Sequence, residues 1–145
     1  MGHFLPMMHI AEELKDRGHD VTVISNEYGG ERIKNIIEEA GCTAAITKDG
    51  ISKEEMRPGD RKLNPGGSTG YNKWLPILKE EIHKVKPDIA VLDFFTVPAF
   101  KACDELGIKV VSNFTYPLEI LNIFGPHHYP QSGNTSNCCG FLCIR

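Results

Sequence analysis

Three times along this 145-residue chain, a helical stripe of apolar residues ends at a glycine, and a short run rich in β-branched residues follows. The glycines are Gly18, Gly41 and Gly107. Apolar residues at three- and four-residue spacing indicate amphipathic helices, and a glycine just past the last turn is typical of a helix end. Because helices and strands alternate, the sequence predicts βαβ units, and therefore an α/β, Rossmann-like parallel sheet with helices on both faces.

The same patterns give approximate bounds for each element. We expect helices from near Pro6 to Gly18 and over 31–40, roughly 73–85, 97–106 and 117–124, and strands over 21–24, 43–47, 89–92 and 108–112. Residues 48–70 are polar, rich in glycine and unpatterned, so they predict a long loop. Pro76 lies either near the start of its helix or at a kink in it. We expect a Rossmann-like domain over 1–124 and an irregular tail over 125–145.

Composition and charge exclude several classes of partner. The formal net charge is −3, which disfavours nucleic acid and anionic membranes. No apolar run approaches the roughly 18 residues of a transmembrane helix. The first residues also lack the apolar core of a signal peptide. We therefore expect a cytoplasmic location for this chain.

The five cysteines fall into two kinds. Cys42 and Cys103 stand singly inside patterned segments, so we expect them to be small buried residues. Cys138, Cys139 and Cys143 crowd together near the C-terminus, but their spacing matches no standard zinc pattern. An odd number of cysteines also fits a closed disulfide framework badly. The sequence therefore predicts no metal site.

Two blocks of the chain resemble the UDP-glycosyltransferases, which belong to glycosyltransferase family 1. The first block is GHFLPMMHIAEELKDRGHDVTVIS, which follows that family's G-H-x-x-P-M loop, helix and R-G-H-x-V-T pattern; the matching residues are Gly2, His3, Pro6, Met7, Arg17, Gly18, His19, Val21 and Thr22. The second block is PDIAVLDFFTVPAFKACDELGIKVVSNFT, with matches at Asp93, Ala102, Leu106, Gly107, Ile108 and Thr115. The two blocks occur in the order that the family shows.

The resemblance implies a fold and a reaction. The family has the GT-B fold, in which an N-terminal half binds the acceptor and a C-terminal half binds most of the donor nucleotide; this chain resembles the N-terminal half. The implied reaction is inverting transfer of a hexose from a UDP-sugar, such as UDP-glucose or UDP-glucuronate, to a small lipophilic hydroxyl compound. The UDP-sugar is a co-substrate, and the resemblance implies no metal or other cofactor.

The resemblance also assigns roles to individual residues. His3 is the general base that takes the proton from the acceptor hydroxyl, a task that suits an imidazole near neutral pH. Asp93 hydrogen-bonds that imidazole and stabilises its charged form, as the aspartate of a catalytic triad does. Gly2, Phe94 and Thr115 are the implied substrate-binding residues.

The resemblance further predicts that the chain is a fragment. The family has an apolar strand before the G-H-x-x-P loop, whereas here Met1 stands directly before Gly2. Loss of this central strand would leave its neighbours with unpaired edges. Because the donor half is also missing, we expect the isolated chain to be inactive. A full-length relative could be anchored in the endoplasmic reticulum membrane.

Other interpretations of the same residues remain open. Asp93 could simply cap the turn that follows its strand, and Thr115 could be an ordinary strand-end residue. Met-Gly-His could be the remnant of an expression tag. The chain could also be a non-catalytic binding module that pairs with a separate donor-domain chain. An unrelated dinucleotide-binding domain is disfavoured because no G-x-G-x-x-G motif is present.

Overall fold

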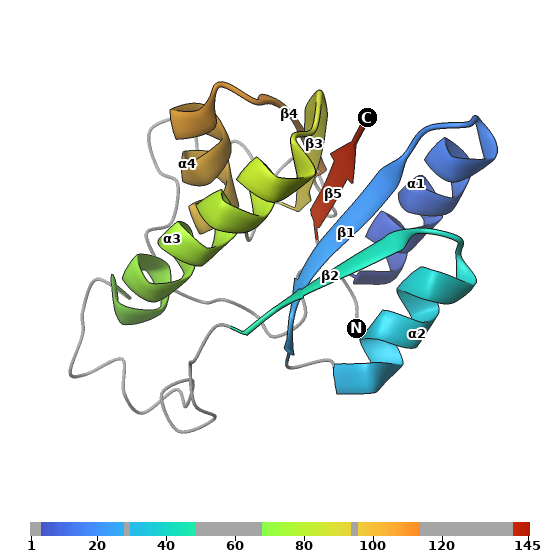
Figure 1. Cartoon of the computed structure of the whole chain (residues 1–145), viewed down its shortest axis with the longest axis horizontal. Helices are drawn as coiled ribbons and strands as arrows, with labels where there is room; N and C mark the ends of the chain where they lie inside the picture. The colour runs from blue at the N-terminus through green and yellow to red at the C-terminus, as the bar shows by residue number, and fades with distance from the viewer. Residues whose placement is uncertain (1–3, 28–29, 49–67, 94–95, 114–140) are drawn as a thin grey trace, which may run out of the picture.

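The structure is a computed structural model, and it describes residues 4–27, 30–48, 68–93, 96–113 and 141–145. Within these residues, four helices and five strands form an α/β fold, compatible with the Rossmann-like class (Figure 1). In chain order the elements are α1 (Phe4–Asp16), β1 (Val21–Asn26), α2 (Gly30–Glu39), β2 (Thr43–Thr47), α3 (Ser68–Val85), β3 (Ile89–Asp93), α4 (Val97–Leu106), β4 (Lys109–Asn113) and β5 (Phe141–Ile144). The α/β class that the sequence predicts is therefore confirmed.

The five strands form one open sheet in the order β2-β1-β5-β3-β4. Two parallel pairs, β1 with β2 and β3 with β4, lie on either side of β5. The central strand β5 runs antiparallel to both of its neighbours, and Figure 1 shows it between β1 and β3. The sheet is therefore mixed, and not wholly parallel as the sequence predicts.

Strand β5 corrects two expectations from the sequence. The tail over 125–145 was expected to be irregular, but residues 141–144 form the central strand and are all buried. The edges of β1 and β3 were expected to be unpaired, but both strands pair with β5. The physical reason is that four apolar residues carry little local signal, and their strand conformation is stabilised by hydrogen bonds to partners far away along the chain.

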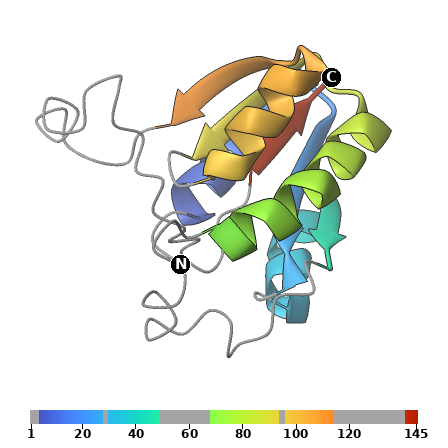
Figure 2. The same cartoon turned by 90° about the vertical axis from the view of Figure 1, so that its left-hand side faces the viewer.

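The sheet separates two apolar cores. Helices α1 and α2 cover one face, here called the α1 face, and helices α3 and α4 cover the other, the α3 face (Figures 1 and 2). Side chains of β5 alternate between them: Leu142 and Ile144 enter the core on the α1 face, and Phe141 and Cys143 enter the core on the α3 face. The C-terminal strand therefore contributes to both cores at once.

Helix ends follow the glycines that mark them in the sequence. The backbone N–H of Gly18 donates to Lys15 O at 2.9 Å, and the N–H of His19 donates to Leu14 O at 3.1 Å. Gly18 has a φ of +90°, which a residue with a side chain adopts only under strain. This pair of hydrogen bonds is the Schellman motif, and it recurs at Gly41 and at Gly107.

Most predicted bounds agree with the structure to within two residues. Strand β2 and helix α4 have the predicted bounds, whereas α3 begins at Ser68, about five residues before the predicted start. The stretch 68–72 contains Gly70 and no apolar stripe, so it carries little local helical signal. Pro76 lies inside α3. The helix predicted over 117–124 lies outside the described residues.

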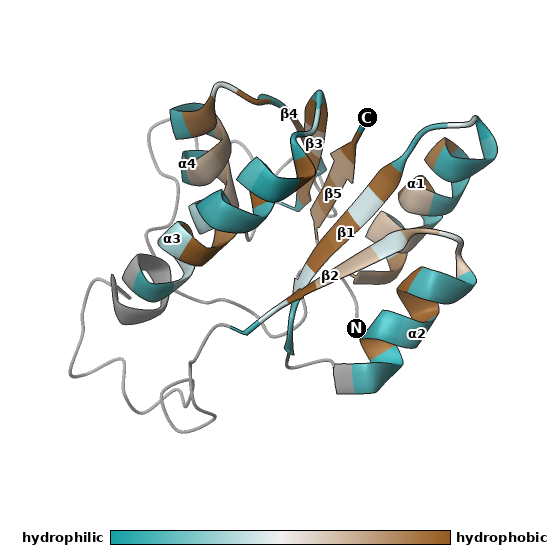
Figure 3. Cartoon of the chain, in the orientation of Figure 1, coloured by the Kyte–Doolittle hydropathy of each residue, from teal (hydrophilic) through white to brown (hydrophobic). Residues whose placement is uncertain are grey.

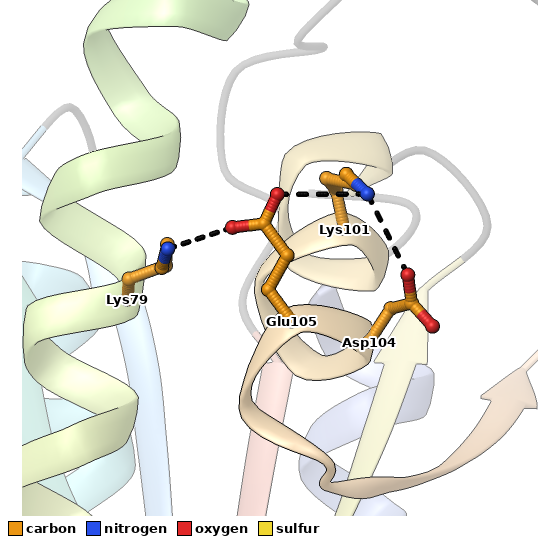
Figure 4. Close-up of polar contacts among 4 residues, drawn as sticks. All are labelled: Lys79, Lys101, Asp104 and Glu105. Carbon is orange, nitrogen blue, oxygen red and sulfur yellow. Dashed lines mark hydrogen bonds and ion pairs between the residues drawn. The ribbon is translucent and has the colours of Figure 1, made fainter.

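An ion pair joins α3 and α4 on their outer surface, and two more lie next to it within α4 (Figure 4). Lys79 Nζ on α3 lies 2.6 Å from Glu105 Oε2 on α4, and Lys101 Nζ lies 3.5 Å from Glu105 Oε1 and 3.6 Å from Asp104 Oδ2. The hydrogen bond from Lys79 lowers the pKa of the Glu105 carboxyl. The partly exposed Lys79–Glu105 pair joins the two helices that cover the α3 face, whereas the two pairs of Lys101 lie within α4.

Hydropathy follows the layers of the fold. Figure 3 shows hydrophobic colour along β5 and in most of β1, while α2 and α3 carry hydrophilic residues over much of their surface. In the part of the chain that the structure describes, no helix is long and apolar enough to cross a bilayer.

Candidate functional site

Every parallel strand ends in a polar residue. These residues are Asn26 on β1, Thr47 on β2, Asp93 on β3 and Asn113 on β4. Because parallel strands share a direction, their carboxyl ends meet at one edge of the sheet, where open α/β sheets bind ligands. The chain moves outward from β1 to β2 on one side and from β3 to β4 on the other. The change of direction lies between β1 and β3, which is where such sheets form their binding crevice.

Three polar side chains share the α1 face of this edge. Ser25 and Asp93 each stand two residues after a core residue of the α1 face, Val23 and Val91 respectively, so they lie on that same face of the sheet. Both are only 1% exposed. Asn113 lies beside Asp93 in the register of β3 and β4, and its Nδ2 lies 3.3 Å from Sδ of Met7 on α1. A carboxyl, an amide and a hydroxyl are therefore arranged along the edge that α1 covers.

The α3 face of the same edge is held by a short chain of hydrogen bonds. Trp74 Nε1 donates to Thr47 Oγ1 at 3.4 Å, and Thr47 Oγ1 donates to the backbone oxygen of Ser25 at 3.2 Å. All three groups are buried. These contacts hold the end of β1 against β2 and α3. They involve the backbone of Ser25, whose side chain lies on the α1 face. Trp74 belongs to the core on the α3 face.

The turn after β3 is closed by the backbone carbonyl of Asp93. This oxygen accepts hydrogen bonds from the Thr96 N–H at 2.9 Å and from the Thr96 hydroxyl. Thr96 then precedes α4, which has Pro98 in its first turn. The turn thus uses the main chain of Asp93, and it places the Asp93 side chain at the carboxyl end of a buried strand.

The structure describes one of the five predicted site residues. Asp93 lies at the carboxyl end of β3, as expected for a residue that faces a ligand. Gly2, His3, Phe94 and Thr115 lie outside the described residues. The roles assigned to these five residues therefore stay predictions.

The sequence prediction missed the polar residues at or next to the strand ends, apart from Asp93. Ser25, Asn26, Thr47 and Asn113 were not predicted as site residues, although each lies within two residues of the end of an apolar run. Strand bounds are uncertain by a few residues in sequence, and a shift of one residue moves a side chain to the other face. These positions could have been found from the polar residues that follow the apolar part of each predicted strand.

The described cysteines are buried in the cores. Cys42, Cys103 and Cys143 are free and buried, which confirms the expectation for the first two. Burial raises the pKa of the Cys103 thiol to about 11. Burial, helped by the nearby Cys103, raises the pKa of the Cys143 thiol to about 12. Such thiols stay protonated at neutral pH, when they are poor nucleophiles and poor metal ligands.

Within the described ranges, no group of three or more histidine, cysteine or acidic residues is arranged to hold a metal ion. Cys138 and Cys139 lie outside those ranges.

Comparison of the chain with protein-family models and with curated proteins finds no match in either. The case for a function therefore depends on the two motif blocks and on the chemistry of the sheet edge.

Proposed function

We propose that this chain is the acceptor-binding part of an inverting, UDP-sugar-dependent glycosyltransferase that acts on small lipophilic hydroxyl compounds. The observation that carries the proposal is the position of Asp93. It is a buried carboxyl at the carboxyl end of β3, on the face that α1 covers, beside the Asn113 side chain that contacts α1. The proposed mechanism requires a carboxyl on this side of the sheet, close to the start of α1, because His3 immediately precedes that helix.

The proposed chemistry uses His3 and Asp93 as a pair. The imidazole of His3 takes the proton from the acceptor hydroxyl while that oxygen attacks the anomeric carbon of the sugar. The Asp93 carboxylate stabilises the imidazolium that forms. A single displacement inverts the anomeric centre, and the UDP leaves with the electron pair of the broken bond. The site of the UDP belongs to a donor domain outside these residues, so the 145-residue chain alone is expected to transfer no sugar.

The test uses 4-methylumbelliferone, a fluorescent phenol whose neutral and ionised forms differ in excitation spectrum. We expect the bound phenol to ionise about one pH unit below the free phenol, since a histidine–carboxylate pair favours the phenolate. His3→Ala and Asp93→Asn should abolish this shift. The matched controls are His9→Ala and Asp104→Asn, which alter an exposed histidine on α1 and an exposed aspartate on α4.

Three results would contradict the proposal. The folded chain could fail to bind the phenol, the shift could persist in both site variants, or the controls could abolish it equally. Turnover of UDP-glucose or UDP-glucuronate by the chain alone would overturn the expectation that a donor domain is needed.

A second candidate function is the binding module that pairs with a separate donor-domain chain. Exposed apolar side chains favour it: Leu5 on α1 is 46% exposed and Val111 on β4 is 49% exposed. The same two elements supply Met7 and Asn113 at the sheet edge. This function predicts that Asp93→Asn leaves the ionisation of a bound phenol unchanged, which separates it from the catalytic proposal.

A further inference from the structure

The hydroxyl of Ser25 is buried and has no hydrogen-bond partner among the residues that the structure describes. The residue is 1% exposed, and its Oγ makes no hydrogen bond to any of these residues. Leaving a buried hydroxyl unpaired destabilises a fold, and the great majority of buried polar groups are hydrogen-bonded. An unpaired hydroxyl at a sheet edge is therefore a group that a ligand can satisfy.

The position of Ser25 directs this hydroxyl to the candidate site. Strand β5 begins at Phe141, which lies opposite Ile24, whereas β1 continues through Ser25 to Asn26. Across β5, the last residue of β3 that pairs with β5 is Val91, which lies opposite Leu142, and β3 likewise continues to Asp93. Ser25 and Asp93 thus occupy corresponding positions on the two strands between which the chain changes direction.

The separation of these two residues suits a small ring compound. They lie on the same face and on strands separated by one intervening strand, so two strand spacings place their backbones roughly 10 Å apart. A single six-membered ring with a hydrogen bond of about 2.8 Å at each end spans a comparable distance. A hydroxyl compound bound at this edge could therefore contact both residues.

Ser112 resembles Ser25 in burial of its hydroxyl but lies on the other face of the sheet. Its hydroxyl is also buried, and within the described ranges it has no hydrogen-bond partner. It precedes Asn113 on β4, so by strand alternation it points to the α3 face, away from Asp93 and Met7. Ser112 therefore offers a control that shares the chemistry of Ser25 but lies on the other face of the sheet.

We infer that Ser25 is a substrate-binding residue whose hydroxyl hydrogen-bonds a hydroxyl or ring oxygen of the acceptor, at the carboxyl edge between β1 and β3. The class of ligand, a small hydroxyl compound, rests on the function proposed above. The unpaired state of the hydroxyl and its place on the Asp93 face rest on the structure.

Two measurements on the full chain test this inference. The first compares the thermal stability of Ser25→Ala and Ser112→Ala without ligand, and both variants should melt at or above the temperature of the wild type because each loses an unpaired hydroxyl. The second titrates 4-methylumbelliferone and follows its affinity. Ser25→Ala should bind about fivefold more weakly, which is the value of one neutral hydrogen bond, while Ser112→Ala should bind as the wild type does.

The outcomes separate this inference from the proposed function. Clear destabilisation by Ser25→Ala, but not by Ser112→Ala, would mean that the hydroxyl has a partner inside the protein, and would overturn the inference. If Ser25→Ala keeps full affinity while Asp93→Asn still abolishes the ionisation shift, the inference fails and the proposed function stands. If the wild type does not bind the phenol, both fail.

Discussion

Strands β4 and β5 lie at opposite positions in the sheet, one at its edge and one at its centre. In β5 the sequence FLCI is wholly buried between two partner strands. In β4 the sequence KVVSN lies at the edge, with Val110 37% and Val111 49% exposed. The β-branched residues of β4 made it predictable as a strand, whereas β5 was expected to be irregular. The contrast shows that residue type indicates which segments favour strand formation, and that long-range pairing decides which segment is central.

The central position gives β5 its importance. The pair β1–β2 and the pair β3–β4 are joined within the described sheet by β5. At the C-terminal end of β5, further backbone hydrogen bonds continue its pairing with the chain on both sides. The N–H groups of Asp20 and Arg145 each donate to the carbonyl oxygen of the other residue, and the N–H of Asp88 donates to Ile144 O at 2.9 Å. One short segment therefore connects two halves that the chain builds separately.

The largest effect is expected from truncating side chains in the two strands. Leu142→Ala in β5 should destabilise the protein by about 2–5 kcal/mol, because the side chain is fully buried and its loss leaves a cavity. The matched change Val111→Ala in β4 should cost less than about 1 kcal/mol. Urea unfolding measures both, and equal losses would remove the distinction between the two strands.

The next effect concerns pH and the buried thiol of β5. Burial raises the pKa of Cys143 from the ordinary value of a thiol, near 9.0, to about 12, so the folded state keeps a proton that the unfolded state releases. This contribution to stability is complete below pH 9 and is lost as the pH rises toward 12, by up to about 1.4 kcal/mol per pH unit.

This pH dependence can be isolated with Cys143→Ala. Urea unfolding under reducing conditions should give a wild-type advantage over the variant that is constant between pH 7 and 8 and declines above pH 9. An advantage that stays constant up to pH 11 would show that the thiol of β5 is not protected in the folded state.

A smaller effect is expected at the turn that leads into β4. Gly107 has a φ of +69°, so Gly107→Ala should destabilise by about 1–2 kcal/mol through backbone strain, although there is open space around the added methyl group. Gly107→Asn should cost less, since asparagine tolerates this conformation better. Thermal unfolding of both variants tests the ordering, and a neutral Gly107→Ala would contradict it.

The smallest effect is expected at the ion pair that ends β5. Arg145 lies 2.6 Å from Asp20 Oδ2, and both side chains are about half exposed, so a double-mutant cycle with alanine should give a coupling of about 0.2–1 kcal/mol. The pair Lys79–Glu105, also at 2.6 Å, provides the comparison between helices. Both couplings should shrink at high salt, and a coupling at Asp20 well above this range would contradict the weak contribution expected of a half-exposed pair.

The candidate site was predictable in part. The carboxyl ends of parallel strands meet at one edge, so Asp93 could be placed there from the end of the apolar run before it. Ser25 and Asn113 could not be assigned to a face in this way, because a one-residue error in strand register reverses the face. The contact of Asn113 with Met7 joins positions that are 106 residues apart, and no local pattern encodes it.

The sequence by itself determined the helices, their glycine ends and the strands that directly follow them. These features depend on hydrogen bonds and side-chain spacing within a few residues, so Gly18, Gly41 and Gly107 could be read locally. Only the tertiary structure decided that residues 141–144 complete the sheet, that β4 lies at its edge, and that Ser25 and Asp93 share one face. Strand pairing joins segments far apart in the chain, and a short apolar segment becomes a strand because of the partners it meets.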